Sequence, residues 1–301
     1  MGLLLLLPLV LGLATASGLA RLSGTRSALS GDHLVIAEVF RRLIGWRIGG
    51  FVAGLALAVA IPVVALGVFH LDAPEALVFW APAALALVYL LSLLIGEHVA
   101  YRPADAQRSA TLTPRAPGRY VTVRDLAVPL AVTVWFAAVA VWTWAITNES
   151  GNVLITCASP YPNDYNASSH SSLDRSTAWA CLAAVAVAAV LTRLVAHQAS
   201  FRPRPDTEVF ALAEDDALRR SSIRAALGIY TSFVAIVGAG FTLSLADVLT
   251  SDFEPCGAPS WWYPVGVALW WSLLVWLAAY VWGIVQVVSR PVPVRTSAMI
   301  G

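Results

Sequence analysis

Seven apolar runs of about 20 residues constrain the fold of this chain more than any other feature. They cover residues 2–20, 48–68, 76–96, 126–147, 177–197, 225–249 and 263–288. About 20 apolar residues in a helix cross a hydrocarbon core of roughly 30 Å, and lipid leaves no backbone group unpaired. Charged residues make up only 12% of the chain, too few to cover a water-exposed surface. The sequence therefore predicts an all-α polytopic membrane protein, a seven-helix transmembrane bundle in a single domain over residues 1–301.

The distribution of arginine predicts the orientation of these helices. All 19 basic residues are Arg, and all but Arg175 fall in four segments: 21–47, 99–125, 193–224 and the tail after 288. Cytoplasmic loops of membrane proteins collect positive charge. We therefore expect a plasma membrane protein with its N-terminus outside and its C-terminus in the cytoplasm. Arg without Lys is also typical of a GC-rich genome, which indicates a high-GC bacterium as the source.

The first apolar run allows a second interpretation. Residues 2–20 resemble a signal peptide, with a Leu run and the sequence Ala14-Thr15-Ala16-Ser17 as a cleavage site. However, the run has no basic residues before it, and five Arg follow it. Cleavage would leave those Arg outside, against the trend of every later loop, so we expect a retained helix.

An internal repeat relates the cytoplasmic segments. Three helices end at the cytoplasm with Arg-Pro, and an offset of 100 residues also matches two further Arg pairs. The Arg-Pro pairs are Arg102-Pro103, Arg202-Pro203 and Arg290-Pro291, and the offset pairs are Arg119 with Arg219 and Arg124 with Arg224. Arg binds the carbonyl end of a helix and Pro stops its continuation. We predict three helix–cytoplasmic loop–helix repeats plus a closing helix.

The offset pairs of the repeat lie just before a helix re-enters the bilayer. Arg119 and Arg124 precede one helix, and Arg219 and Arg224 precede another. Short amphipathic segments on the anionic inner leaflet explain this placement. A docking surface for a cytoplasmic protein is the functional alternative.

The outer loop 148–176 contains residue types that occur in disulfides and in hydrolase active sites. Cys157 in this loop and Cys256 in the next outer loop lie on an oxidising face, which predicts a disulfide between them. Ser, His and Asp also occur together in this loop, as a hydrolase would need. No nucleophile elbow accompanies them, and a Ser-rich polar linker is the simpler interpretation.

Ionisable residues gather near the cytoplasmic ends of two helices. Glu97 and His98 end one helix, while Arg193 and His197 lie four residues apart on one face of another. They predict either a polar cluster at the inner mouth, with Glu97 paired to Arg193, or separate side chains that extend to the membrane surface. His98 and His197 lie at similar depth, which also suggests a bis-His haem site, but nothing else in the chain supports haem.

The remaining sequence features argue against catalysis. The chain has no nucleotide-binding or zinc-protease motif, and no stretch between apolar runs is long enough for a soluble catalytic domain. Its net charge of +1 excludes a nucleic-acid partner, and we expect no cofactor or metal. We predict a non-enzymatic accessory subunit that binds the lipid bilayer and other membrane or cytoplasmic proteins. The alternative is a small-molecule permease or transporter subunit, which the internal repeat favours.

Overall fold

Among the residues that it describes, the computed structural model contains six helices long and apolar enough to cross a membrane, as a multi-pass membrane protein requires. They are α2 (Leu34–Val68), α3 (Pro74–Val99), α4 (Val123–Ile146), α5 (Arg175–Phe201), α6 (Val209–Thr250) and α7 (Trp262–Val288). The structure describes residues 34–68, 74–99, 120–148, 152–156, 166–170, 173–203, 209–251 and 259–289. The expected first helix at 2–20 lies outside the described residues.

Two helices begin much earlier than their apolar runs. α2 starts at Leu34 and α6 at Val209, each more than a dozen residues before the predicted start. The 42 residues of α6 span about 63 Å at 1.5 Å per residue, roughly twice the hydrocarbon thickness. Hydropathy finds only the part of a helix that lipid surrounds. Residues 214–222 of α6 are polar for the most part and are instead buried or half-buried in the bundle, so hydropathy missed them.

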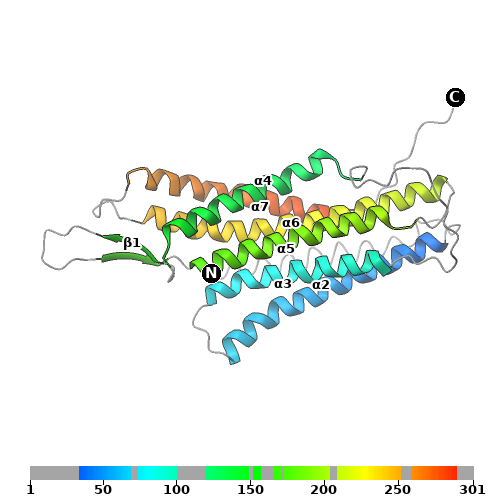
Figure 1. Ribbon diagram of the computed structural model, residues 1–301, viewed down its shortest axis with the longest axis horizontal. Coiled ribbons are helices and arrows are strands. Elements are labelled where there is room, and N and C mark those ends of the chain that lie inside the picture. Colours follow the sequence, from blue (N-terminus) through cyan, green and yellow to red (C-terminus); the bar gives the residue numbers. More distant parts are fainter. Residues whose placement is uncertain are drawn as a thin grey trace, which may run out of the picture.

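The helices form an elongated bundle around α6 (Figure 1). Because successive helices alternate in direction, α2, α4 and α6 begin at the same end of the bundle where α3, α5 and α7 finish. We call this the Arg-rich end, since Arg47, Arg124, Arg202, Arg219 and Arg224 lie there. The opposite end, where α4 finishes and α5 begins, is called the hairpin end.

The hairpin end carries the strands that give it this name. β1 (Asn152–Thr156) pairs antiparallel with β2 (Asn166–His170), with Leu154 opposite Ser168. The expected polar linker is therefore partly a β-hairpin, and the chain is not purely α-helical. Cys157 and Cys256 lie outside the described residues, so their disulfide stays a prediction. Cys181, in α5, is a buried free thiol.

Helix packing does not follow the predicted repeat units. The most extensive contacts join α6 to α7 and α2 to α3. In each of these pairs, the first helix ends and the second begins at the hairpin end. α4 packs mainly on α6, while α3 packs on α2 and α5, so the predicted α3–α4 unit is not a packed hairpin. α5 and α6 do pack together. Sequence similarity between loops does not decide which helices become neighbours.

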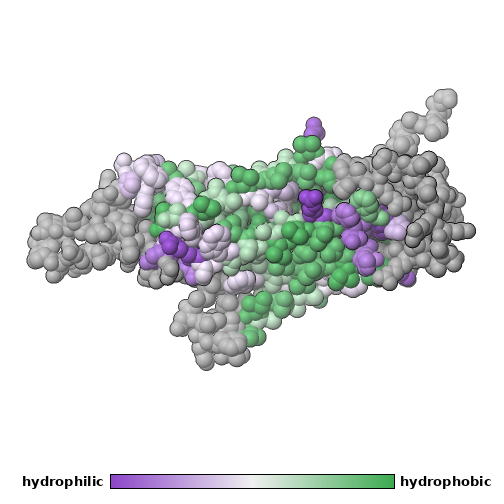
Figure 2. Space-filling view, viewed as in Figure 1, coloured by the Kyte–Doolittle hydropathy of each residue, from purple (hydrophilic) through white to green (hydrophobic). Residues whose placement is uncertain are grey.

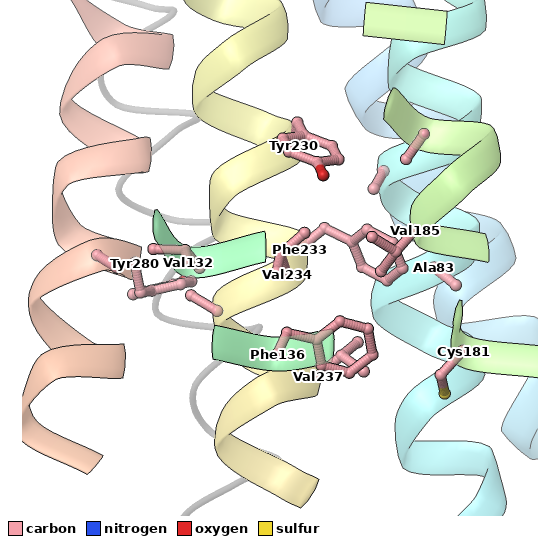
Figure 3. Close-up of a cluster of buried hydrophobic side chains, with 14 of the residues drawn as sticks. Ala83, Val132, Phe136, Cys181, Val185, Tyr230, Phe233, Val234, Val237 and Tyr280 are labelled. Atoms are coloured by element: carbon pink, nitrogen blue, oxygen red, sulfur yellow. The ribbon is translucent and has the colours of Figure 1, made fainter. Parts of the chain in front are cut away.

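The interior of the bundle is filled by aromatic and aliphatic side chains (Figure 3). Phe241 meets Phe79 and Phe136 edge-on, with ring centroids 5.5 and 5.6 Å apart. The indole of Trp276 donates to the Thr242 hydroxyl at 2.9 Å, which satisfies its N–H away from water. On the surface, a hydrophobic band covers the middle of the bundle, with hydrophilic residues to either side (Figure 2).

Candidate functional site

The polar core of the Arg-rich end starts where α5 stops. Arg202 is the C-cap of α5, and its backbone N–H donates to the Gln198 carbonyl at 2.9 Å. Pro203 follows and cannot continue the helical hydrogen bonds. The backbone thus turns away after Phe201, and the Arg202 side chain enters the space between α3 and α6.

The guanidinium of Arg219, on α6, caps the carbonyl end of α5. Nη1 donates to the Ala199 and Ser200 carbonyls at 2.9 and 2.8 Å, and Nη2 donates to the Arg202 carbonyl at 2.7 Å. The last carbonyls of a helix have no partner within the helix and carry partial negative charge. The sequence predicted that Arg caps this helix, but the capping residue comes from another helix.

Two carboxylates complete the cluster. Asp215 accepts from Arg202 Nη2 and from Arg219 Nε, both at 2.7 Å. Glu97, near the end of α3, accepts from Arg202 Nη1 at 2.9 Å. We call Glu97, Arg202, Asp215 and Arg219 the ion clamp, because they join α3, α5 and α6.

Because the ion clamp is buried, each of its charged groups needs an oppositely charged partner. Each of the four side chains is at most 2% exposed. Burial alone would lower the pKa of Arg202, but the charges and hydrogen bonds of Glu97 and Asp215 outweigh burial and raise it. Two guanidinium groups face two carboxylates, so the cluster is formally neutral. A buried charge without its partner would be strongly unfavourable.

Further polar contacts hold the first turns of α6 against its neighbours. Arg47, on α2, is buried and donates to the hydroxyls of Ser221 and Ser222, each at 3.0 Å. Tyr120 donates to Asp216 at 3.1 Å. The extension of α6 beyond its apolar run therefore acts as a polar connector for the whole Arg-rich end.

The predicted inner-mouth residues separate in the structure. Glu97 is buried, while His98, Arg193 and His197 are exposed. Glu97 pairs with Arg202 instead of Arg193, and the His197 ring stacks on Phe201 at 4.4 Å. Arg202 pairs with Glu97 in place of Arg193 because it lies beyond the end of α5, where the chain turns and directs its side chain inward.

The repeat anchors are only partly within the described residues. Arg102, Pro103, Arg119, Arg290 and Pro291 lie outside them. Of the others, Arg202 and Arg219 are buried in the ion clamp, which corrects the view of Arg219 as part of a lead-in on the membrane surface. Arg124 is exposed in the first turn of α4, and Arg224 lies 3.7 Å from Asp125.

Sequence reasoning missed Asp215, although a signal was present. Asp215 and Arg219 stand four residues apart, the spacing of an intrahelical ion pair, just before an apolar run. Reading the run as the start of the helix placed both residues in a loop. An extended helix would have put them on one face.

The chemistry of the ion clamp suits a fixed structure. Arg side chains stay protonated in proteins, so Arg202 and Arg219 do not relay protons. Within the described ranges, no group of three His, Cys, Asp or Glu residues is arranged to hold a metal ion. No family model, curated protein or solved structure matches the chain.

Proposed function

We propose that this chain is a non-enzymatic membrane subunit that acts by binding other proteins. The observation that carries the proposal is the ion clamp, in which two acidic and two basic side chains are used to join three helices. Between the ends of the bundle, the interior is packed with side chains such as Phe136 and Phe241. Both features favour a rigid scaffold whose surfaces make the contacts.

The proposed topology extends the six helices to seven. Retention of residues 2–20 as a helix places the N-terminus outside the plasma membrane and the C-terminus in the cytoplasm. The Arg bias supports this orientation, because the Arg-rich segments 99–125 and 193–224 join α3 to α4 and α5 to α6 at the Arg-rich end. Arg175 is the one Arg outside the four Arg-bearing segments. The three-unit repeat belongs to the same proposal and is supported by the matched Arg positions.

The Arg-rich end is the proposed partner surface. Arg124 and Arg193 are exposed there, near the ends of two different helices. Arg residues at such positions bind acidic side chains or lipid phosphates. A cytoplasmic protein with an acidic surface fits this end best.

Site-specific crosslinking tests the proposal. A photoreactive residue replaces Arg124 in the native membrane, and a second variant carries it at Trp179, an exposed residue near the hairpin end. We expect one protein to be captured from position 124 and not from position 179. Purified wild-type protein should leave ion and solute gradients in liposomes unchanged. A protein that purifies alone and dissipates such a gradient is a permease, and the proposal is then wrong.

A further inference from the structure

At the hairpin end, residues of α4 and α5 line a groove with only apolar and aromatic walls. Val141, Trp144, Ala178, Trp179 and Leu182 line it, and its volume is about 210 Å³. The Trp144 and Trp179 rings meet edge-on across it, with centroids 6.2 Å apart. Trp179 is 61% and Val141 is 54% exposed, so the groove opens to the outside of the bundle.

A cation lies at the rim of this groove. Arg175, the first residue of α5, donates from Nε to the Trp144 carbonyl at 3.3 Å. Its guanidinium carbon lies 5.3 Å from the centroid of the Trp144 ring, a cation–π contact. These two contacts fix the charge over the wall of the groove. The hydrogen bond uses only Nε, so it engages neither Nη1 nor Nη2.

The depth of these residues matches the layers of a lipid. Leu182 lies about 10 Å below Arg175 along the α5 axis, within the apolar run that crosses the hydrocarbon core. Arg175 lies at the end of that run, where headgroups begin. Trp side chains at this depth are typical of the membrane interface.

The chemistry around Arg175 favours a phosphate. Guanidinium groups bind phosphate oxygens through strong charge-assisted hydrogen bonds. The neighbouring Asp174 carboxylate is itself occupied, because it accepts from the Thr177 N–H at 2.7 Å and from the Ser176 hydroxyl at 2.8 Å. An apolar chain beneath a phosphate is the one arrangement that satisfies both the groove and its rim.

We propose that this groove is a binding site for one glycerophospholipid of the adjacent leaflet, with an acyl chain between α4 and α5 and the phosphate on Arg175. The site does not depend on the proposed partner function. It is also separate from the ion clamp, which lies at the other end of the bundle.

Native mass spectrometry of the full chain tests the site, with phosphatidylglycerol added to delipidated protein. We expect one phospholipid to survive mild activation in wild type. Arg175→Gln should weaken its binding about tenfold, the equivalent of one charge-assisted hydrogen bond, and Arg175→Lys should weaken it less. Val141→Trp fills the groove and should abolish retention. Phosphatidylethanolamine should bind as well, since both lipids carry the phosphate.

Two matched variants control for general effects. Arg42→Gln removes an exposed Arg from α2 at the Arg-rich end, and Val134→Trp adds a Trp on the same exposed face of α4 two turns from Val141. Both should retain lipid as wild type does, and circular dichroism should show the same helix content in all variants. Equal losses in Arg175→Gln and Arg42→Gln would overturn the site. So would retention that Val141→Trp leaves intact, or binding of detergent alone with no dependence on Arg175.

Discussion

Glu97 and Arg202 depend on the other charges of the ion clamp for their pairing. In Glu97→Gln the cluster carries one excess positive charge, and in Arg202→Gln one excess negative charge. Loss of one member of a buried pair costs about 3–5 kcal/mol. We therefore expect each single variant to lower the free energy of unfolding by that amount, measured by chemical denaturation in detergent micelles.

The double variant distinguishes charge balance from simple packing. Glu97→Gln with Arg202→Gln leaves Asp215 paired to Arg219, so the cluster is neutral again. We expect it to be more stable than the sum of the single losses predicts, with a coupling energy of roughly 0.5–3 kcal/mol. Arg193→Gln, at an exposed position on α5, is the control and should change stability by less than about 0.5 kcal/mol. Additive losses would mean that the charges are not coupled.

The cap of α5 predicts a pH dependence at a single residue. Burial alone would raise the pKa of Asp174, but hydrogen bonds from Thr177 and Ser176 outweigh it and hold the pKa below its usual value. The ionised cap therefore contributes fully above the unfolded pKa of about 3.9. That contribution is lost as the pH falls through the lower, folded pKa.

Hydrogen exchange measures this cap directly. Asp174→Ala should speed exchange in the first turn of α5 at pH 7 by about fivefold, which corresponds to a typical N-cap of about 1 kcal/mol. Asp174→Asn keeps a capping oxygen, so its difference from wild type should shrink as the pH falls below about 4. The Thr122–Asp125 capping box of α4 is the internal reference. A difference that does not vary with pH would contradict the assignment.

Among the elements, α6 and α7 have the most extensive contact. A Cβ on Gly228 would collide with the Gly283 carbonyl, and a Cβ on Gly283 would collide with Ser232 Oγ. Small residues let membrane helices pack with their backbones in contact. The extensive α6–α7 contact therefore depends on these two glycines.

Gly283→Ala should push the two helices apart and lower stability by about 1–3 kcal/mol, as overpacking does. Gly49, on α2, is the matched control, because a Cβ added there would meet nothing within 4 Å. Gly49→Ala should keep or raise stability by up to about 1 kcal/mol, because Ala favours the helix. Thermal unfolding of both variants in one detergent makes the comparison. A change at Gly283→Ala no worse than the change at Gly49→Ala would show that the close α6–α7 contact does not limit stability.

For the whole molecule, orientation is the property that labelling can test. In a variant with its native cysteines replaced by Ser, Thr113→Cys probes the loop 99–125 and Ser176→Cys probes the hairpin end. A membrane-impermeant thiol reagent applied to intact cells should modify position 176 only. The proposed topology places the loop 99–125 in the cytoplasm because it carries five Arg. Labelling at position 113 would therefore contradict that topology.

The sequence predicted six of the helices well because hydropathy is a local property. The ends of α3, α4, α5 and α7 fall within a few residues of the apolar runs. The starts of α2 and α6 were missed, because charged and polar residues within 34–47 and 209–224 lower the hydropathy there. In α6, most of residues 214–224 are buried inside the bundle. Glu97 was singled out in the sequence with Arg193 as its predicted partner, whereas in the structure it pairs with Arg202.

Three properties therefore follow from the amino-acid order alone: the membrane class, the approximate helix ends and the segments in which Arg collects. Each of these depends on the transfer of a short segment between water and lipid. Which charges are buried was decided by the tertiary structure. Arg193 and Arg202 stand close together in the sequence, yet one is exposed and the other pairs with Glu97 and Asp215. That outcome depends on which helices become neighbours and on how the chain turns after Phe201.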